Sequence, residues 1–461
     1  MAYLFNIQSI IQPSLKEAVG IILGIITIIS LFIIGVGTVP HIPILLSILF
    51  LIAFGLLKKI SFEQIEQGMF GGARSGIGAV FIFFLIGILI SSWILSGTIP
   101  SMIYAAFQIV TPSFFYAIVF LVTAIVGLGI GSSLTTVATL GVAFIGVGEA
   151  LDASAAITAG AVVSGAFFGD KMSPLSDTTT LAASIVGVNL FTHIRNMAYT
   201  TIPAFLISMI LFAIISPENG ASDFPKISGI KETLLQTNLI HWYSWLPLLL
   251  LFIFSIRKVS PFITLAISSL TAVLLSFFHI DLTFSEIIGA LFSGYISETG
   301  NADVDALLSR GGMESMMFTI SLVLLSLSLG GLLFTLGIIP RLFQTIEQKM
   351  KSAASVITGA ALSAIGINVV IGEQYLSILL TGEAFQQQFE KVGLAKKNLS
   401  RALEDAGTVI NPLVPWGVCG VFIADMLAVP TLQYLPFAFF CLLSPILTIL
   451  FGFTGWTLSK K

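Results

Sequence analysis

The sequence predicts an all-α polytopic membrane protein, and three observations support this prediction. The chain of 461 residues is 56% hydrophobic and only 9% charged, far below the roughly 25% of charged residues in soluble domains. Many of its apolar runs approach the ~20 residues with which a helix spans a bilayer. Two polar segments that contain proline, residues 169–180 and 404–415, interrupt these runs.

The apolar runs define the predicted membrane segments in chain order. Uniformly apolar runs occupy residues 18–36, 43–57, 78–96, 114–131, 199–216, 240–256, 260–278, 317–336, 353–371 and 433–457. Less uniform stretches at 133–149, 154–192 and 402–428, with a short segment at 373–387, are also expected to enter the membrane. About 12 to 14 crossings or re-entrant pieces follow, with uncertain boundaries.

Composition argues against several other functions. A net charge of −3 without a basic patch gives no site for nucleic acid. Cys419 and Cys441 lie in apolar surroundings and give neither a disulfide framework nor metal-ligand spacing. No nucleophile constellation, Gly-rich phosphate loop or selectivity-filter repeat is present, so we expect no enzyme, no cofactor and no channel.

The chain contains an internal repeat. Residues 71–100 align with residues 311–340 at a constant offset of 240, with more identities than this composition predicts. The matching pairs are Gly71/Gly311, Gly72/Gly312, Ser75/Ser315, Leu85/Leu325, Leu89/Leu329, Gly97/Gly337, Ile99/Ile339 and Pro100/Pro340. At an offset of 238, Gly169, Pro174 and Leu175 match Gly407, Pro412 and Leu413. The two polar segments are therefore related to each other.

Loop charges indicate that the two halves are inverted. Lys58, Lys59 and Arg74 lie in the segment 58–76, whereas six acidic residues and one arginine lie in its counterpart, 279–314. By the positive-inside rule, the two loops face opposite sides of the membrane. We therefore expect a first repeat over residues 1–216, an extracellular linker over 217–239, a second repeat over 240–461 and two cytoplasmic termini. Inverted repeats with interrupted helices are typical of secondary transporters that work by alternating access.

The first polar segment contains the main candidate site. Pro174 disfavours helix at the preceding residue, so a helix over 155–168 is expected to break there and to resume after about Thr178. Unwound carbonyls and hydroxyls can bind Na⁺, and a partly buried carboxylate can bind Na⁺ or a proton. The candidates are Asp170, Lys171, Ser173, Asp177 and Thr178. Two alternatives are a structural ion pair between Lys171 and an aspartate, and a surface loop.

The second polar segment repeats this chemistry around Pro412. Asp405, Thr408 and Asn411 supply an acid, a hydroxyl and an amide there. With Asp170 and Asp177, Asp405 is a candidate Na⁺ ligand. Asp405 is alternatively the cap of a helix at the cytoplasmic edge, next to Arg401. Asn368 is expected to make a hydrogen bond between helices.

Two glycine-containing segments are predicted to form the tips of re-entrant hairpins. One is residues 129–136, with Ser132, Ser133 and Thr136 as candidate ligands, and the other is residues 372–375, with Glu373. Glycine permits the tight turn, and small polar groups supply ligands. Water-facing turns, and a place for Glu373 at the external rim, are the alternatives.

The motifs in both polar segments resemble those of a known family. The string Gly-Asp-Lys-Met-Ser-Pro-Leu-Ser-Asp-Thr-Thr at 169–179, followed by Asn-Leu-Phe-Thr-His-Ile-Arg at 189–195, resembles the signature of the NhaC family of Na⁺/H⁺ antiporters. So do Glu-Asp-Ala-Gly-Thr at 404–408 and Asn-Pro-Leu-Val-Pro-Trp at 411–416. The chain departs from the family pattern at Leu134, where an aromatic residue is common, and at Ala406, where serine is common.

The resemblance implies a function and a location. It implies a protein of a bacterial-type plasma membrane, surrounded by lipid and compatible with oligomers, that extrudes Na⁺ in exchange for protons. Similar proteins include exchangers of Na⁺ and lactate against malate and protons. The alternative is therefore a Na⁺- or H⁺-coupled carrier of a small organic anion or an amino acid, in which Lys171 helps to hold the anion.

Overall fold

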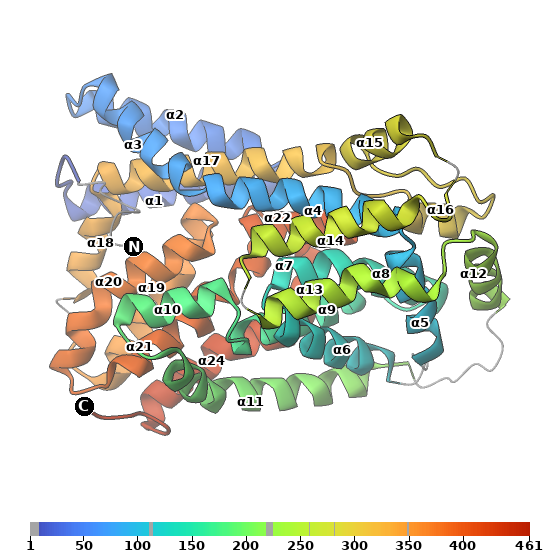
Figure 1. Cartoon of the computed structure of the whole chain (residues 1–461). Coiled ribbons are helices and arrows are strands. Elements are labelled where there is room, and N and C mark those ends of the chain that lie inside the picture. Colours follow the sequence, from blue (N-terminus) through green and yellow to red (C-terminus); the bar gives the residue numbers. More distant parts are fainter. Residues whose placement is uncertain (1–8, 110–113, 218–224, 258, 281, 348–349) are drawn as a thin grey trace.

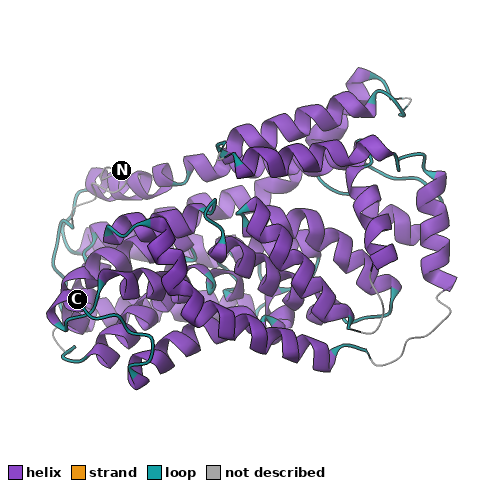
Figure 2. Ribbon diagram, turned by 60° about the horizontal axis from the view of Figure 1, so that its bottom comes forward, coloured by secondary structure: helices purple, strands orange, loops and turns teal. Residues whose placement is uncertain are grey.

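The structure is a computed structural model that describes residues 9–461 except 110–113, 218–224, 258, 281 and 348–349. The described residues form helices joined mostly by short loops and contain no strand (Figure 2). The prediction of an all-α fold is confirmed. Part of the expected linker, residues 218–224, lies outside the described residues, while the rest of the linker contains a helix over Pro225–Gln236.

The first half of the chain forms helices α1 to α11, labelled in Figure 1. Their bounds are α1 Leu15–Ser30, α2 His41–Leu57, α3 Phe62–Ser75, α4 Ile77–Leu95, α5 Thr98–Ile109, α6 Phe115–Ile130, α7 Ser133–Thr136, α8 Val142–Ala150, α9 Ala155–Met172, α10 Asp177–Val186 and α11 Leu190–Ile215. π-Helical turns extend α1 over Leu31–Gly35 and connect α7 to α8 over Val137–Gly141.

The second half forms helices α12 to α24. Their bounds are α12 Pro225–Gln236, α13 Leu246–Ile256, α14 Pro261–Ser276, α15 Phe284–Ser293, α16 Ala302–Leu308, α17 Met317–Thr335, α18 Ile338–Glu347, α19 Ala353–Ile371, α20 Gln374–Lys391, α21 Lys396–Leu403, α22 Val418–Leu427, α23 Thr431–Tyr434 and α24 Phe439–Thr454. A π-helical turn, Glu404–Thr408, follows α21, and single 3₁₀ turns occupy Trp242–Trp245, Glu314–Met316, Asn411–Leu413 and Leu435–Phe437.

The helices are long and apolar enough for a polytopic membrane protein. Within the described ranges, six helices qualify as spans by length and composition, and each of two bent pairs can add one more. Five shorter apolar helices accompany them. These helices support a polytopic membrane protein, and the expected number of 12 to 14 membrane segments remains a prediction. One bent pair, Lys396–Leu413 with Val418–Leu427, turns by 46° at the second polar segment.

Helix boundaries recur at the spacing of the predicted repeat. Helices α4 and α17 both have 19 residues and begin at residues 77 and 317. Helices α10 and α22 both have 10 residues and begin at residues 177 and 418. The offset of 240 is that of the sequence alignment of residues 71–100, whereas 241 is three residues more than the 238 at which the polar segments align. The inversion of the halves and their limits at 216 and 240 remain predictions.

The two ends of the bundle differ in the helices they hold. Helices α18, α20 and α21 lie at the same end as the C-terminus, whereas α5, α12, α15 and α16 lie at the opposite end (Figure 1).

The C-terminal residues pair with the turn between α20 and α21. The Ala395 N–H donates to the Ser459 carbonyl at 2.9 Å, and the Lys461 N–H donates to the Gly393 carbonyl at 2.9 Å. The Asn398 amide also donates to the Ser459 carbonyl at 2.7 Å.

Helices α6 and α9 pack so closely that glycine is required between them. A Cβ on Gly169 of α9 would lie 2.4 Å from the Leu128 nitrogen and 2.5 Å from the Gly127 carbonyl carbon of α6. Small residues allow membrane helices to approach to backbone contact. This contact fixes the end of α9, and therefore Asp170, beside the loop that follows α6.

Candidate functional site

The two predicted hairpin tips are built in the same way. Helix α6 ends at Gly131 (φ +72°), and helix α19 ends at Gly372 (φ +79°), both in the left-handed region that favours glycine. The next polar residue then caps the following helix. The Ser132 hydroxyl accepts a hydrogen bond from the Thr135 N–H at 3.3 Å, and the Glu373 carboxylate accepts one from the Leu376 N–H at 2.7 Å.

Each tip packs against a break between helices of its own half. The first break is residues 173–176, between α9 and α10, and the second break is residues 409–417, between the π-helical turn Glu404–Thr408 and α22. A Cβ on Gly131 would lie 2.7 Å from the Leu175 Cβ, between α9 and α10. A Cβ on Gly372 would lie 3.1 Å from the Trp416 carbonyl oxygen, just before α22. The tips and the breaks are therefore two compact units, one in each half. Whether the tips are re-entrant in the membrane remains a prediction.

The first break is shorter than the sequence predicted. Helix α9 continues to Met172 instead of ending at 168, and α10 begins at Asp177. Ser173 has the extended conformation that a following proline favours, so the break begins directly before Pro174. Asp170 and Lys171 consequently lie in the last helical turn of α9, whereas the sequence placed them in the unwound segment.

Asp170 connects the first break to the first tip. Its side chain is 3% exposed, and the Ser133 hydroxyl donates to Asp170 Oδ2 at 2.7 Å. Asp170 Oδ1 has no hydrogen-bond partner among the described residues. Asp170 is thus a buried carboxylate with one oxygen held and the other available to a ligand, as a cation or proton site requires.

The other candidate residues of the first half make hydrogen bonds to groups close to them in the chain. The Thr136 hydroxyl donates to the Ser132 carbonyl at 2.8 Å. The Ser173 hydroxyl accepts from the Leu175 N–H at 3.2 Å, and the Thr178 hydroxyl shares a 3.0 Å hydrogen bond with Ser176. Ser173 and Thr178 are fully buried beside Asp170 and Asp177, so both lie where the sequence placed the site.

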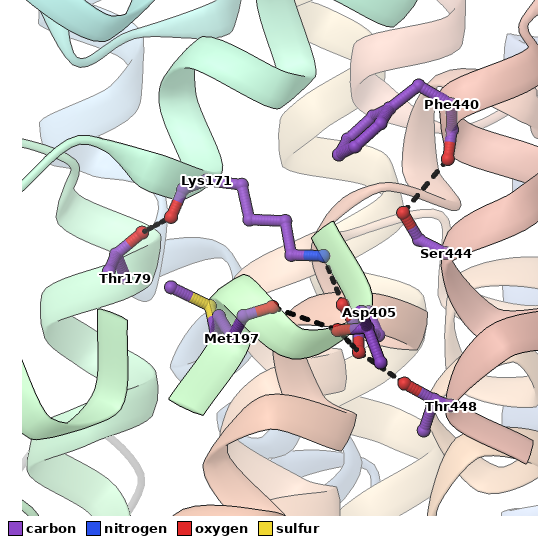
Figure 3. Close-up of polar contacts among 8 residues, drawn as sticks. Lys171, Thr179, Met197, Asp405, Phe440, Ser444 and Thr448 are labelled. Carbon is purple, nitrogen blue, oxygen red and sulfur yellow. Dashed lines mark hydrogen bonds and ion pairs between the residues drawn. The ribbon is translucent and has the colours of Figure 1, made fainter. Parts of the chain in front are cut away.

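Lys171 and Asp405 form a buried ion pair across the two halves (Figure 3). Neither side chain is exposed. Asp405 also accepts hydrogen bonds from Thr448 and, at 2.7 Å, from the Thr200 hydroxyl. The Lys171 ammonium lies 5.4 Å from the ring centre of Phe440. The structure thus has the ion pair that was one alternative for Lys171, and Asp405 does not cap a helix at an edge.

Asp177 and Tyr375 form a second contact between the halves. The Tyr375 hydroxyl, within the second tip, donates to Asp177 Oδ2. Asp177 is exposed, whereas Glu373 is 5% exposed and interacts electrostatically with Asp177. Burial of Glu373 at the tip argues against a place at the external rim.

Asn411 and Asn368 hold the second break together. As expected, Asn368 of α19 makes hydrogen bonds between segments: its amide donates to the Gly407 carbonyl at 2.7 Å, and its oxygen accepts from Asn411 at 2.8 Å. Asn411 Oδ1 accepts from the Cys419 N–H at 2.8 Å. The side-chain nitrogen and oxygen of Asn411 therefore both make hydrogen bonds. The buried Thr408 hydroxyl, in contrast, has no hydrogen-bond partner among the described residues.

The three aspartates predicted as Na⁺ ligands are not gathered into one ligand set. Asp405 is paired with Lys171, Asp177 with Tyr375, and Asp170 with Ser133. The described residues contain no group of three or more His, Cys, Asp or Glu that could hold a metal ion. Sequence reasoning assigned no role to Tyr375, Thr200, Thr448 or Glu404, whose positions depend on contacts between distant segments.

Comparison with known proteins identifies the family. The model of the Na⁺/H⁺ antiporter family matches residues 165–456, which include both breaks and the second tip. The Na⁺/H⁺ antiporter NhaC of Alkalihalophilus pseudofirmus is 43% identical over 96% of this chain and 95% of its own. The chain belongs to the Na⁺/H⁺ antiporter family.

Other relatives of this antiporter carry different names. The arginine/ornithine antiporter ArcD of Halobacterium salinarum is 34% identical over 98% of this chain and 94% of its own. The malate-2H⁺/Na⁺-lactate antiporter of Bacillus subtilis is 30% identical over 96% of this chain and 95% of its own. Family membership confirms the resemblance seen in the polar segments. It also identifies the chain as a multi-pass membrane transporter, not an enzyme.

Proposed function

We propose that this protein exchanges Na⁺ for protons by alternating access across a bacterial-type plasma membrane, extruding Na⁺ as protons enter. The observation that carries the proposal is Asp170, a buried carboxylate with one oxygen held by Ser133 and the other without a partner among the described residues. Such a carboxylate can bind either a proton or a sodium ion but not both, which is the simplest chemistry of exchange.

The surroundings of Asp170 support a cation as the transported species. Asp177 interacts electrostatically with Asp170 from the other side of the break and is exposed, so it can supply ions to the buried carboxylate. The Thr408 hydroxyl comes from the second half. Carboxylate and hydroxyl oxygens are the donors that hard cations prefer. With the Lys171 charge compensated by Asp405, the remaining acids leave this region negative.

The two units of tip and break supply the framework for alternating access. Each unit is compact, and they are linked by the Lys171–Asp405 and Tyr375–Asp177 contacts. In secondary transporters the site lies between repeats that move against each other around the substrate. We place the Na⁺ and H⁺ site at this junction.

Flux measurements in proteoliposomes test the proposal. With the purified protein and a pH-sensitive dye inside the vesicles, an imposed Na⁺ gradient should change the internal pH without any organic solute. Vesicles that contain the Asp170→Asn variant are the control. A wild-type protein that moves no protons in response to Na⁺ would reject the proposal.

The names of two relatives favour one second candidate, a cation-coupled exchanger of a small carboxylate or amino acid. This alternative needs a cation for the substrate carboxylate, and the sequence offered Lys171. In the described part of the chain, the buried cations are Lys171, which is paired with Asp405, and Arg401, which donates to Thr457 at 3.1 Å. Uptake of labelled lactate, malate, arginine and ornithine decides between the two functions.

A further inference from the structure

Glu404 is a buried acid that the exchange mechanism above does not use. It begins the π-helical turn Glu404–Thr408 and has no solvent exposure. Neither of its carboxylate oxygens has a hydrogen-bond partner among the described residues. A buried carboxylate without partners is costly, so such a group in a membrane protein generally marks an ion pathway.

Glu404 and its neighbour Asp405 differ in their contacts. Asp405 contacts Lys171, Thr200 and Thr448. Glu404 makes none of these contacts and lies within electrostatic range of Asp170 of the first half, as well as of Lys171 and Asp405. Consecutive residues of a helix point in different directions, which separates the paired acid from the unpaired one.

Thr408 lies on the same side of the π-helical turn as Glu404. In a π-helix, residues four apart lie nearly above one another because each turn takes more than four residues. The Thr408 hydroxyl is close to Glu404. It is also buried, and it has no hydrogen-bond partner by distance and angle in the described ranges. π-Helical turns are frequent at functional sites.

We propose that Glu404 is a ligand of the transported cation, which it binds together with Asp170 and Thr408 between the two halves of the chain. The inference rests on the proposed Na⁺/H⁺ exchange and adds a carboxylate from the second half to its site. The Lys171–Asp405 ion pair brings the segments of Asp170 and Glu404 together. Asp170, Glu404 and Thr408 are buried, each has an oxygen without a hydrogen-bond partner, and none forms an ion pair with Lys or Arg in the described part of the chain.

Two carboxylates around one cation also define the substrate class. Oxygen-only donors suit a hard cation such as Na⁺. A substrate carboxylate would meet two acids of the same charge, and like charges at close range disfavour binding. The site therefore selects a small inorganic cation over an organic anion.

Equilibrium binding of ²²Na⁺ to the purified full-length protein tests the inference. The Glu404→Gln variant keeps the size of the side chain and removes its charge, so the affinity for Na⁺ should fall at least about tenfold, the scale on which losing a metal-site residue weakens binding. Glu404→Asp and Thr408→Val should weaken binding less. Glu383→Gln, at an exposed position of α20, is the matched control and should bind as the wild type does.

Wild-type affinity for ²²Na⁺ in Glu404→Gln would overturn the inference. If that variant does not elute as a folded protein, the milder Glu404→Asp and Thr408→Val carry the test, and wild-type affinity in both has the same meaning. A structural role for Glu404 would lower thermal stability and leave the affinity of the folded fraction unchanged, which also overturns the inference.

Flux measurements separate this inference from the proposed function. A wild-type protein that binds ²²Na⁺ through Glu404 but moves no protons would reject Na⁺/H⁺ exchange and support the cation site. A wild-type protein that exchanges Na⁺ for protons, with unchanged Na⁺ affinity in Glu404→Gln, would support exchange and reject the role of Glu404.

Discussion

Lys171 and Asp405 lie 234 positions apart in the chain, and their side chains form an ion pair with no solvent exposure. The pair joins the last turn of α9 to the π-helical turn after α21 (Figure 3). Asp170 and Glu404, both buried, are the chain neighbours of its two partners. Removing one partner of a buried pair leaves an uncompensated charge. The pair thus links the two halves of the chain, and each of its side chains compensates the buried charge of the other.

Neutralising one partner of this pair should destabilise the protein more than neutralising both. Lys171→Met or Asp405→Asn should each cost about 3 to 5 kcal/mol, because the remaining charge is buried and unpaired. The double variant should recover part of that loss. A double-mutant cycle on chemical unfolding in detergent measures the coupling. The exposed pair Lys58–Glu17 is the control, and its coupling should be much smaller because solvent screens both charges. Additive losses at Lys171 and Asp405 would contradict the prediction.

Asp170→Asn should abolish Na⁺-driven proton flux and leave the fold intact. The amide keeps the size of the side chain and can still accept from Ser133, but it carries no charge and takes up no proton at physiological pH. Proteoliposome flux measures the loss, and size-exclusion elution measures folding. Asp152→Asn is the control, because Asp152 lies in a loop with φ +51°, a conformation that asparagine adopts readily. Equal loss of folded protein in Asp170→Asn would indicate a structural role.

Alanine at Gly131 should impair the protein more than alanine at Gly366. The left-handed conformation alone costs an ordinary residue roughly 1 to 2 kcal/mol. The new Cβ would also lie 2.7 Å from the Leu175 Cβ and 3.0 Å from the Ser173 oxygen, so it pushes the tip away from the break that holds Asp170. Thermal unfolding and Na⁺ affinity should both decrease. Gly366→Ala in α19, where a Cβ meets no atom within 4 Å, should be neutral or stabilising. Equal behaviour of the two variants would disprove the role of the tip.

Acid should loosen the loop before α16. The Thr299 N–H and hydroxyl both donate to Asp305 at 2.7 Å, and these hydrogen bonds hold the pKa of Asp305 below its usual value of 3.8. Because the pKa is lowered in the folded state, the stabilisation is fully present above pH 3.8 and is lost as the pH falls through the lowered pKa. Hydrogen exchange at the Thr299 amide should accelerate over that range. In Asp305→Asn the exchange rate, corrected for intrinsic chemistry, should not show this transition.

Local sequence signals predicted the breaks and the tips well. Pro174 and Pro412 mark the breaks because proline removes a donor and restricts the residue before it. Gly131 and Gly372 mark the tips because a left-handed turn favours glycine. The end of α9 was placed four residues too early, since proline constrains only its immediate neighbour and Asp170 and Lys171 remain helical.

Contacts between distant segments decided the rest of the site. Asp405 and Glu404 are adjacent acids in the sequence, and nothing in their order indicates which one faces Lys171 and which one faces Asp170. Tyr375 and Thr448 reach their aspartates only through the packing of α20 and α24. The one signal that could have directed attention to Glu404 is its position beside Asp405 in a predicted membrane segment. Each buried acid in a membrane is costly, so a role for Asp405 does not account for the presence of Glu404.

The pairing of the C-terminal residues with the turn before α21 has a practical consequence for the laboratory. Residues 459–461 are bonded to residues 393–398, directly ahead of the helix that leads to Glu404 and Asp405. An affinity tag or fluorescent protein fused after Lys461 would disturb the hydrogen bonds between these residues and that turn. Purification handles belong elsewhere, and a fluorophore attached at the C-terminus would report on movement of α21.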